Sequence, residues 1–138
     1  GDFIIAEDDI NVFNDRCNID KIFNDATKVD YDLLYFEMCW MNCSQSKKIT
    51  NCLFKLHNPL CNGFILHKHH CISKIREYFM QNLSDDPIDL VLADMCKDDT
   101  LKAYGYPIFR QDPRFGSNIE TSARWTNKSI VFDNVCVM

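Results

Sequence analysis

The apolar residues of this chain recur mostly at helical spacing. From Glu7 onward, Ile10, Phe13 and Cys17 fall on one face of a helix, with acidic and amide residues between them. A second apolar group around residues 19–23 continues this helix or begins another after a kink. The pattern therefore predicts that the body of the chain starts with a helix near Glu7.

The most apolar stretch, residues 31–44, predicts a helix that is buried on all sides. Asp30 is a suitable N-cap for it, because a side-chain oxygen there can accept from the free N–H groups of the first turn. Apolar side chains surround the expected helix: Leu33, Leu34, Tyr35, Phe36, Met38, Trp40 and Met41. Such a helix belongs in the middle of a bundle.

Three further helices complete the predicted body. One is expected over residues 47–57, where Pro59 ends it, and one over residues 65–81. The last begins at Asp86-Pro87 and ends near Lys97, because Asp caps a helix and Pro fits its first turn.

The two ends of the chain predict extended structure instead. Residues 2–6 are an apolar lead-in that suits a short strand, and the β-branched end of the chain, residues 129–138, suits a strand that pairs with it. From Tyr104 onward, prolines and glycines predict an irregular tail that wraps the helical body.

These patterns together predict a mainly α fold in a single domain of residues 1–138. We expect a disulfide-stapled bundle of about five helices over roughly residues 7–103, and an irregular C-terminal third, residues 104–138, with minor β structure.

The cysteines indicate an oxidising compartment. The chain has 138 residues and 8 cysteines, with no Cys-x-x-Cys pair that would suggest a zinc or redox site. We expect all of them in disulfides, with the pairing left open: Cys17, Cys39, Cys43, Cys52, Cys61, Cys71, Cys96 and Cys136. Three N-x-S/T sequons, at Asn42, Asn82 and Asn127, add to the expectation of a secreted glycoprotein or the soluble ectodomain of a surface protein.

Charge and hydropathy argue against some classes of partner. The net charge of −5 and the lack of any Lys/Arg-rich block argue against nucleic acid and against an anionic membrane surface. No apolar run reaches the length of about 18 residues that a membrane span needs, so no membrane span is expected.

Candidate chemistry is sparse. His67 and His70 would lie three residues apart on the expected helix and are the weak candidates for a metal site, but no acidic ligand lies nearby and Cys71 is expected to be bridged. No Gly-x-Ser-x-Gly nucleophile elbow occurs, and adjacent Asp pairs such as Asp8-Asp9 read as helix caps. We therefore expect no catalytic residue, no metal and no cofactor.

The segment CWMNCSQSKKITNCLFKL resembles the helix pair of secreted phospholipases A2 of the plant and group XII type. Cys39-Trp40, Cys43 and Cys52 take the matching positions. The positions of that family's catalytic His-Asp pair hold Phe36 and Glu37 here, and no glycine-rich calcium loop precedes them. The resemblance implies a calcium-free, catalytically dead relative.

The order of cysteines also resembles that of insect odorant-binding proteins. The helical Cys39-x-x-x-Cys43 follows an earlier cysteine, and Cys52, Cys61 and Cys71 come later, but Cys43 and Cys52 lie much closer together than that family requires. This resemblance implies a carrier that binds a small apolar ligand between helices, near Tyr35, Phe36, Met38, Trp40 and Met41.

The aromatic residues of the C-terminal third, interleaved with arginines, suit either a cover over the helical core or a protein-binding surface, because aromatic and arginine side chains are enriched at interfaces. The candidate partner-binding residues are Tyr106, Phe109, Arg110, Arg114, Phe115 and Trp125. The sequence thus favours a non-catalytic module that recognises another extracellular or cell-surface protein, as a ligand, a receptor-binding domain or a host–pathogen surface protein. An apolar-ligand carrier and an inactive phospholipase-like protein are the alternatives.

Overall fold

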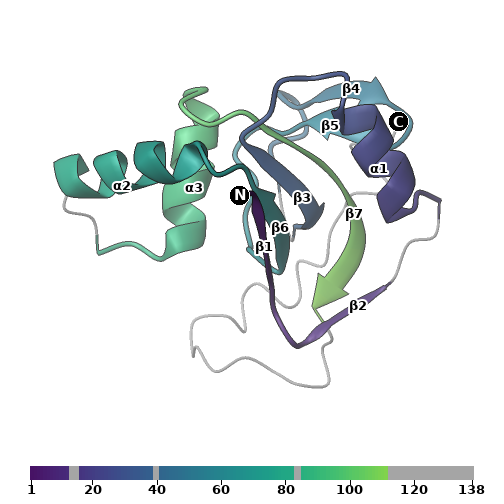
Figure 1. The fold of residues 1–138 in the computed structure, drawn as a ribbon, viewed down its shortest axis with the longest axis horizontal. Coiled ribbons are helices and arrows are strands. Elements are labelled where there is room, and N and C mark those ends of the chain that lie inside the picture. The colour runs from purple at the N-terminus through teal and green to yellow at the C-terminus, as the bar shows by residue number, and fades with distance from the viewer. Residues whose placement is uncertain (13–15, 39–40, 83–84, 112–138) are drawn as a thin grey trace.

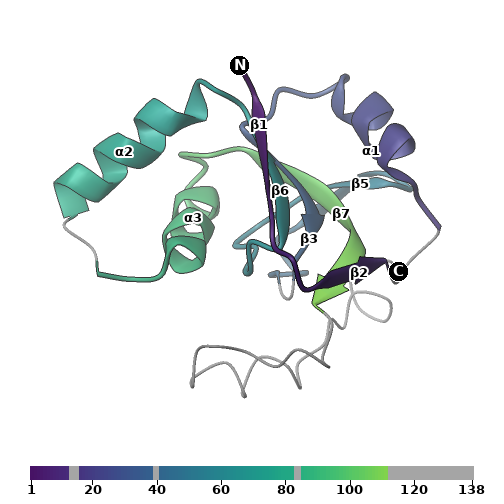
Figure 2. The same cartoon turned by 60° about the horizontal axis from the view of Figure 1, so that its bottom comes forward.

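The computed structural model of the protein describes residues 1–12, 16–38, 41–82 and 85–111. Within these ranges the chain forms three helices and a seven-stranded mixed sheet, so the expected mainly α bundle is wrong. Figures 1 and 2 show the sheet in the middle of the molecule, with α2 and α3 on one side and α1 on the other.

The sheet has the strand order β1-β6-β3-β7-β5-β4, and the short β2 pairs with β7 beside this path. The strands are β1 (Phe3–Ala6), β2 (Ile10–Val12), β3 (Leu33–Glu37), β4 (Lys47–Thr50), β5 (Leu53–Lys55), β6 (Phe64–His67) and β7 (Ala103–Gln111). β3 and β7 run parallel, whereas the other pairs are antiparallel. Since β1 and β3 are both antiparallel to β6, they share one direction.

β3 replaces the helix that was expected over residues 31–44. Its residues are all buried, and neighbouring side chains contact opposite layers. The Phe36 ring lies 5.3 Å from the Phe23 ring on α1 (Ile19–Ala26), whereas Tyr35 lies near the thiol of Cys96 on α3 (Ile88–Lys97). A strand covered on both faces is apolar at every position, and a short run of this kind cannot be told from a buried helix by periodicity.

Two other expected helices are also corrected. Residues 47–57 form the hairpin β4–β5. Residues 65–81 are split between strand β6, which ends at His67, and helix α2 (Cys71–Asn82). The helix expected from Glu7 is absent in residues 7–12, where a turn leads into β2.

The segment expected to be an irregular tail begins with β7, a long strand inside the sheet. Gly105 has a specific role there, because it lies opposite Tyr35 in the register and a Cβ atom would collide with the Tyr35 carbonyl oxygen. β1 does form the expected strand, but it pairs with β6. The C-terminal segment that was expected to pair with it lies outside the described residues.

Helix α3 confirms the helix predicted to end near Lys97, and α1 begins where Asn18 caps it. The Asn18 side chain accepts a hydrogen bond from the Lys21 N–H at 2.8 Å, which satisfies one of the free donors of the first turn. α3 is buried along one face, but α2 is exposed along most of its length, with Cys71 as its buried residue.

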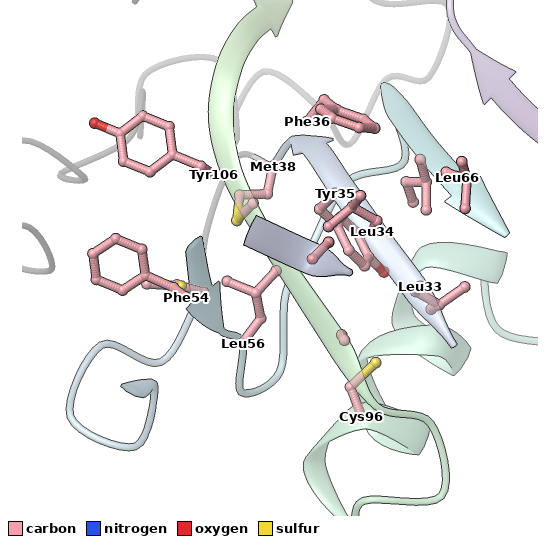
Figure 3. Close-up of a cluster of buried hydrophobic side chains, with 14 of the residues drawn as sticks. Leu33, Leu34, Tyr35, Phe36, Met38, Phe54, Leu56, Leu66, Cys96 and Tyr106 are labelled. Atoms are coloured by element: carbon pink, nitrogen blue, oxygen red, sulfur yellow. The ribbon is translucent and has the colours of Figure 1, made fainter. Parts of the chain in front are cut away.

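The core is continuous from α1 through β3 to α3. Figure 3 shows the part of it around β3, with Tyr106 of β7 and Cys96 of α3. Its largest fully buried side chains are Tyr35, Tyr106, Phe36, Phe54, Ile22, Leu33, Leu34, Met38, Leu53, Ile65, Leu92 and Met95. The aromatic cluster of residues 31–41 is therefore core, as far as the structure describes it.

Candidate functional site

The richest cluster of polar side chains in the described structure surrounds Asp32. This carboxylate is buried and accepts hydrogen bonds from His70 Nε2 at 2.7 Å, from Lys74 Nζ at 3.1 Å and from the Lys102 N–H at 2.8 Å. Asp32 precedes β3, Lys102 precedes β7, and His70 and Lys74 mark the start of α2. One carboxylate thus joins three segments that are distant in sequence.

The hydrogen bonds keep Asp32 ionised. Burial alone would raise its pKa, but the Lys102 N–H, Lys74 and His70 together hold the pKa below its ordinary value. When His70 is neutral, its Nε2 carries the proton that Asp32 accepts, which leaves Nδ1 as a proton acceptor on a half-exposed ring.

A shallow depression of about 600 Å³ lies beside this cluster, and Asp2, Asp30, Tyr31, Lys68, His69 and His70 help to line it. Lys68 forms an ion pair with Asp2 at 2.9 Å and lies 5.0 Å from the centre of the Tyr31 ring. The hydrogen bonds from Lys68 and from the His69 backbone hold the pKa of Asp2 well below its ordinary value.

The two weak metal candidates do not come together. His67 lies on β6, where its ring stacks on Phe3 with 4.9 Å between ring centres, and burial lowers its pKa. Its Nδ1 is buried without a hydrogen-bond partner. His70 is bound to Asp32 instead. Across residues 1–12, 16–38, 41–82 and 85–111, no group of three His, Cys, Asp or Glu side chains is arranged to hold a metal ion.

A second acidic feature lies where β1 and β3 end. Glu37, the last residue of β3, is buried, and its carboxylate accepts from the Gly63 N–H at 2.8 Å. Burial, with further contributions from the negative charges of Glu7 and Asp9, raises the pKa of Glu37 to about 8. Glu37 is therefore mostly protonated at neutral pH. In the resemblance to secreted phospholipases A2, Glu37 takes one of the two positions of the catalytic His-Asp pair.

The cysteines follow the prediction only in part. Cys17 and Cys52 form a disulfide, and Cys43 and Cys61 are also disulfide-bonded. Cys71 and Cys96 are buried free thiols, which departs from the expectation that every cysteine is bridged. Burial raises the pKa of Cys71 to about 11 and that of Cys96 further, so neither is a reactive thiolate. Cys39 and Cys136 lie outside the described residues.

The predicted partner-binding residues do not form one surface in the described chain. Tyr106 is fully buried, and Phe109 is half-buried and stacks on Phe64 with 4.9 Å between ring centres. Arg110 is exposed, but it has an interaction partner of its own. Arg114, Phe115 and Trp125 lie outside the described residues.

The sequons are placed unevenly. Asn82 ends α2 and is exposed, although its side-chain amide donates to the Tyr78 carbonyl at 2.8 Å, and Asn42 is half-buried. Asn127 lies outside the described residues.

The short strand predicted at residues 2–6 is exposed as well as apolar. On β1, the exposed fractions are 37% for Phe3, 49% for Ile4 and 48% for Ile5. Four consecutive apolar residues in a strand are typical of a strand that is covered on both faces. Here the structure leaves both faces of β1 accessible, at one edge of the sheet.

Comparisons with known proteins give no match to this chain among protein-family models, curated proteins or solved structures. None of the helices in the described ranges has the length and apolar character to cross a membrane.

Proposed function

We propose that this chain is a non-catalytic module that recognises another protein, and that the partner binds along β1. The observation that carries the proposal is the exposure of Phe3, Ile4 and Ile5 at the edge of the sheet. Burial of three large apolar side chains is a common source of binding energy, since each contributes about 1.5–3 kcal/mol when it is fully buried.

Charged groups flank this apolar strand at both ends. Asp2, Lys68 and His69 lie at its start, and Asp8 and Asp9 follow its end. An apolar centre with a polar rim is the usual composition of a protein interface. The polar depression described above is then the rim of the proposed site.

The partner that we propose is an extracellular or cell-surface protein. The Cys17–Cys52 disulfide is compatible with an extracellular location, and the exposed Asn82 is compatible with glycosylation there. The alternative of an apolar-ligand carrier required a cavity beside Tyr35, Phe36 and Met38, whereas these three side chains are fully buried in the core.

The proposal is tested by binding to an arrayed panel of purified ectodomains, measured by biolayer interferometry. Ile4→Asp should weaken the Kd of a specific binder by about tenfold or more, because a charge would replace an apolar contact. Ile49→Asp, on the opposite edge strand β4, is the matched control and should leave the Kd unchanged. A binder that is insensitive to Ile4→Asp would contradict the proposal.

A further inference from the structure

We infer that β1 pairs with an additional β-strand supplied by the partner, an extended apolar segment with a lysine or arginine beside Asp8 and Asp9. This inference rests on the proposed function, which it deepens by stating how the partner binds. Four observations carry it: the direction of the backbone groups, the contrast between the two edges of the sheet, the side chains of β1 and the charges that follow them.

The backbone of β1 presents hydrogen-bonding groups to the outside. The Glu7 N–H donates to the Gly63 carbonyl at 2.8 Å, which continues the antiparallel ladder between β1 and β6. Residues in such a pair alternate between bonding to the neighbouring strand and facing away from it. The N–H and C=O groups of Ile4 and Ala6 therefore face the outer edge, where no other strand of the described chain pairs with β1.

The two edges of the sheet differ in how they are protected. The opposite edge strand, β4, carries the exposed Lys47 and Lys48, and charged side chains of this kind discourage pairing with other chains. β1 carries no charged residue between Phe3 and Ala6. β4 is thus protected against pairing with another chain, whereas β1 has the apolar composition of a strand inside a sheet.

The side chains of β1 require apolar contacts on both sides of the sheet. Ile4 and Ile5 point to opposite faces, because successive residues of a strand alternate, and both are about half exposed. An added strand with apolar, β-branched residues would cover part of each face through cross-strand pairs. A globular partner that covered one face alone would leave the other isoleucine in water.

The charges select a foreign strand over a second copy of this chain. Two copies of β1 in parallel would place Asp8 beside Asp8 and Asp9 beside Asp9. An antiparallel pair with Phe3 opposite Ala6 would place Asp2 opposite Glu7. Like charges directly opposite one another destabilise a sheet. A strand that brings a basic residue to Asp8 and Asp9 would instead gain an ion pair.

The probe is a short synthetic peptide with a β-branched apolar centre and lysines at both ends, so that either orientation brings a lysine to Asp8 and Asp9. Binding is measured by fluorescence anisotropy with the whole chain. We expect saturable binding of this peptide. A peptide with the same centre and N-methylated alternate amides should bind at least about tenfold more weakly, because it cannot complete the ladder. Equal binding of both peptides would overturn the inference.

Two variants separate the backbone contribution from the charges. Ile4→Pro removes the outward N–H and leaves the ladder to β6 intact, since proline is tolerated where its missing N–H would face solvent. It should abolish binding, whereas Ile4→Val should retain it. The double variant Asp8→Lys/Asp9→Lys does not touch the strand, and it should reverse the preference from lysine-ended to glutamate-ended peptides. An unchanged preference would contradict the assigned charges.

The outcomes distinguish this inference from the proposed function. Ectodomain binding that is weakened by Ile4→Asp but retained by Ile4→Pro would keep protein recognition and eliminate strand pairing. Light scattering of the free protein should show a monomer. A dimer that Ile4→Pro dissociates would show that a second copy occupies the edge, and it would overturn the choice of a foreign strand.

Discussion

At the scale of single residues, two carboxylates with opposite shifts in pKa occupy the interior. Glu37 is buried beside other acids, so its protonated form is favoured, whereas Asp32 is surrounded by donors and stays ionised. The sequence could not show which of the two has the higher pKa, because both are acidic residues in apolar surroundings. The difference lies in partners that the fold brings from distant segments.

The raised pKa of Glu37 predicts that the free energy of unfolding falls as the pH rises. Its pKa is about 8 in the folded chain and ordinary in the unfolded chain, so between about pH 5 and pH 8 the folded state binds the extra proton. Unfolding free energy should then fall with rising pH, by at most about 1.4 kcal/mol per pH unit from this group. Urea denaturation should show that Glu37→Gln, which keeps an acceptor for Gly63, removes this slope. Parallel pH profiles of the two proteins would refute it.

The lowered pKa of Asp32 predicts the opposite dependence of stability on pH. Because its folded-state pKa is lowered, its contribution is present above the ordinary pKa and is lost as the pH falls below about 4. Asp32→Asn should lower the unfolding free energy at pH 7 by about 2–3 kcal/mol, since His70 and Lys74 lose a charged acceptor. Denaturation of Asp94→Asn, an exposed residue of α3, serves as the control and should show little change.

At the scale of elements, the central parallel pair β3–β7 organises the molecule. β3 is buried on both faces, and β7 also pairs with β2 and β5. The close approach of the two strands at Gly105 is the tightest requirement on the sequence, because a Cβ atom there would meet backbone of β3. Backbone cannot rotate away as a flexible side chain can.

Gly105→Ala is therefore expected to be strongly destabilising. The methyl group would force β3 and β7 apart, at a cost of about 1–3 kcal/mol or more. Gly1→Ala is the matched control, since a Cβ atom at Gly1 meets nothing within 4 Å. Thermal unfolding should show a lower Tm for the first variant and an unchanged Tm for the second. Equal Tm values would show that β3 and β7 accommodate the methyl group without loss of stability.

At the scale of the whole molecule, the disulfide Cys17–Cys52 joins the start of α1 to the hairpin β4–β5. The two cysteines are 35 positions apart in the sequence. The bond holds α1 against the sheet. Cys71 and Cys96 belong to the apolar core as buried free thiols.

Removal of this disulfide should therefore be costly. Cys17→Ser/Cys52→Ser should lower the unfolding free energy by about 3–4 kcal/mol, because a loop of this length loses entropy in the unfolded chain when it is closed. Urea denaturation measures the change. Alkylation followed by mass spectrometry should also find Cys71 and Cys96 unreactive in the native protein and reactive once it is unfolded. Rapid native labelling would contradict their burial.

The sequence by itself determined where part of the core, one helix and one short strand lie. It placed the aromatic cluster of residues 31–41 in the core, the helix before Lys97 and a short strand at residues 2–6. These inferences depend on composition and on local capping, which act within a few residues.

Only the tertiary structure decided that the apolar run at Leu33–Glu37 is a strand, because an interior strand and a buried helix show the same uninterrupted hydrophobicity. The same holds for the free thiols, for the shift of Glu37 and for the open edge at β1. Each depends on which distant segment lies beside the residue, and pairing between distant strands leaves no periodic signal in the chain.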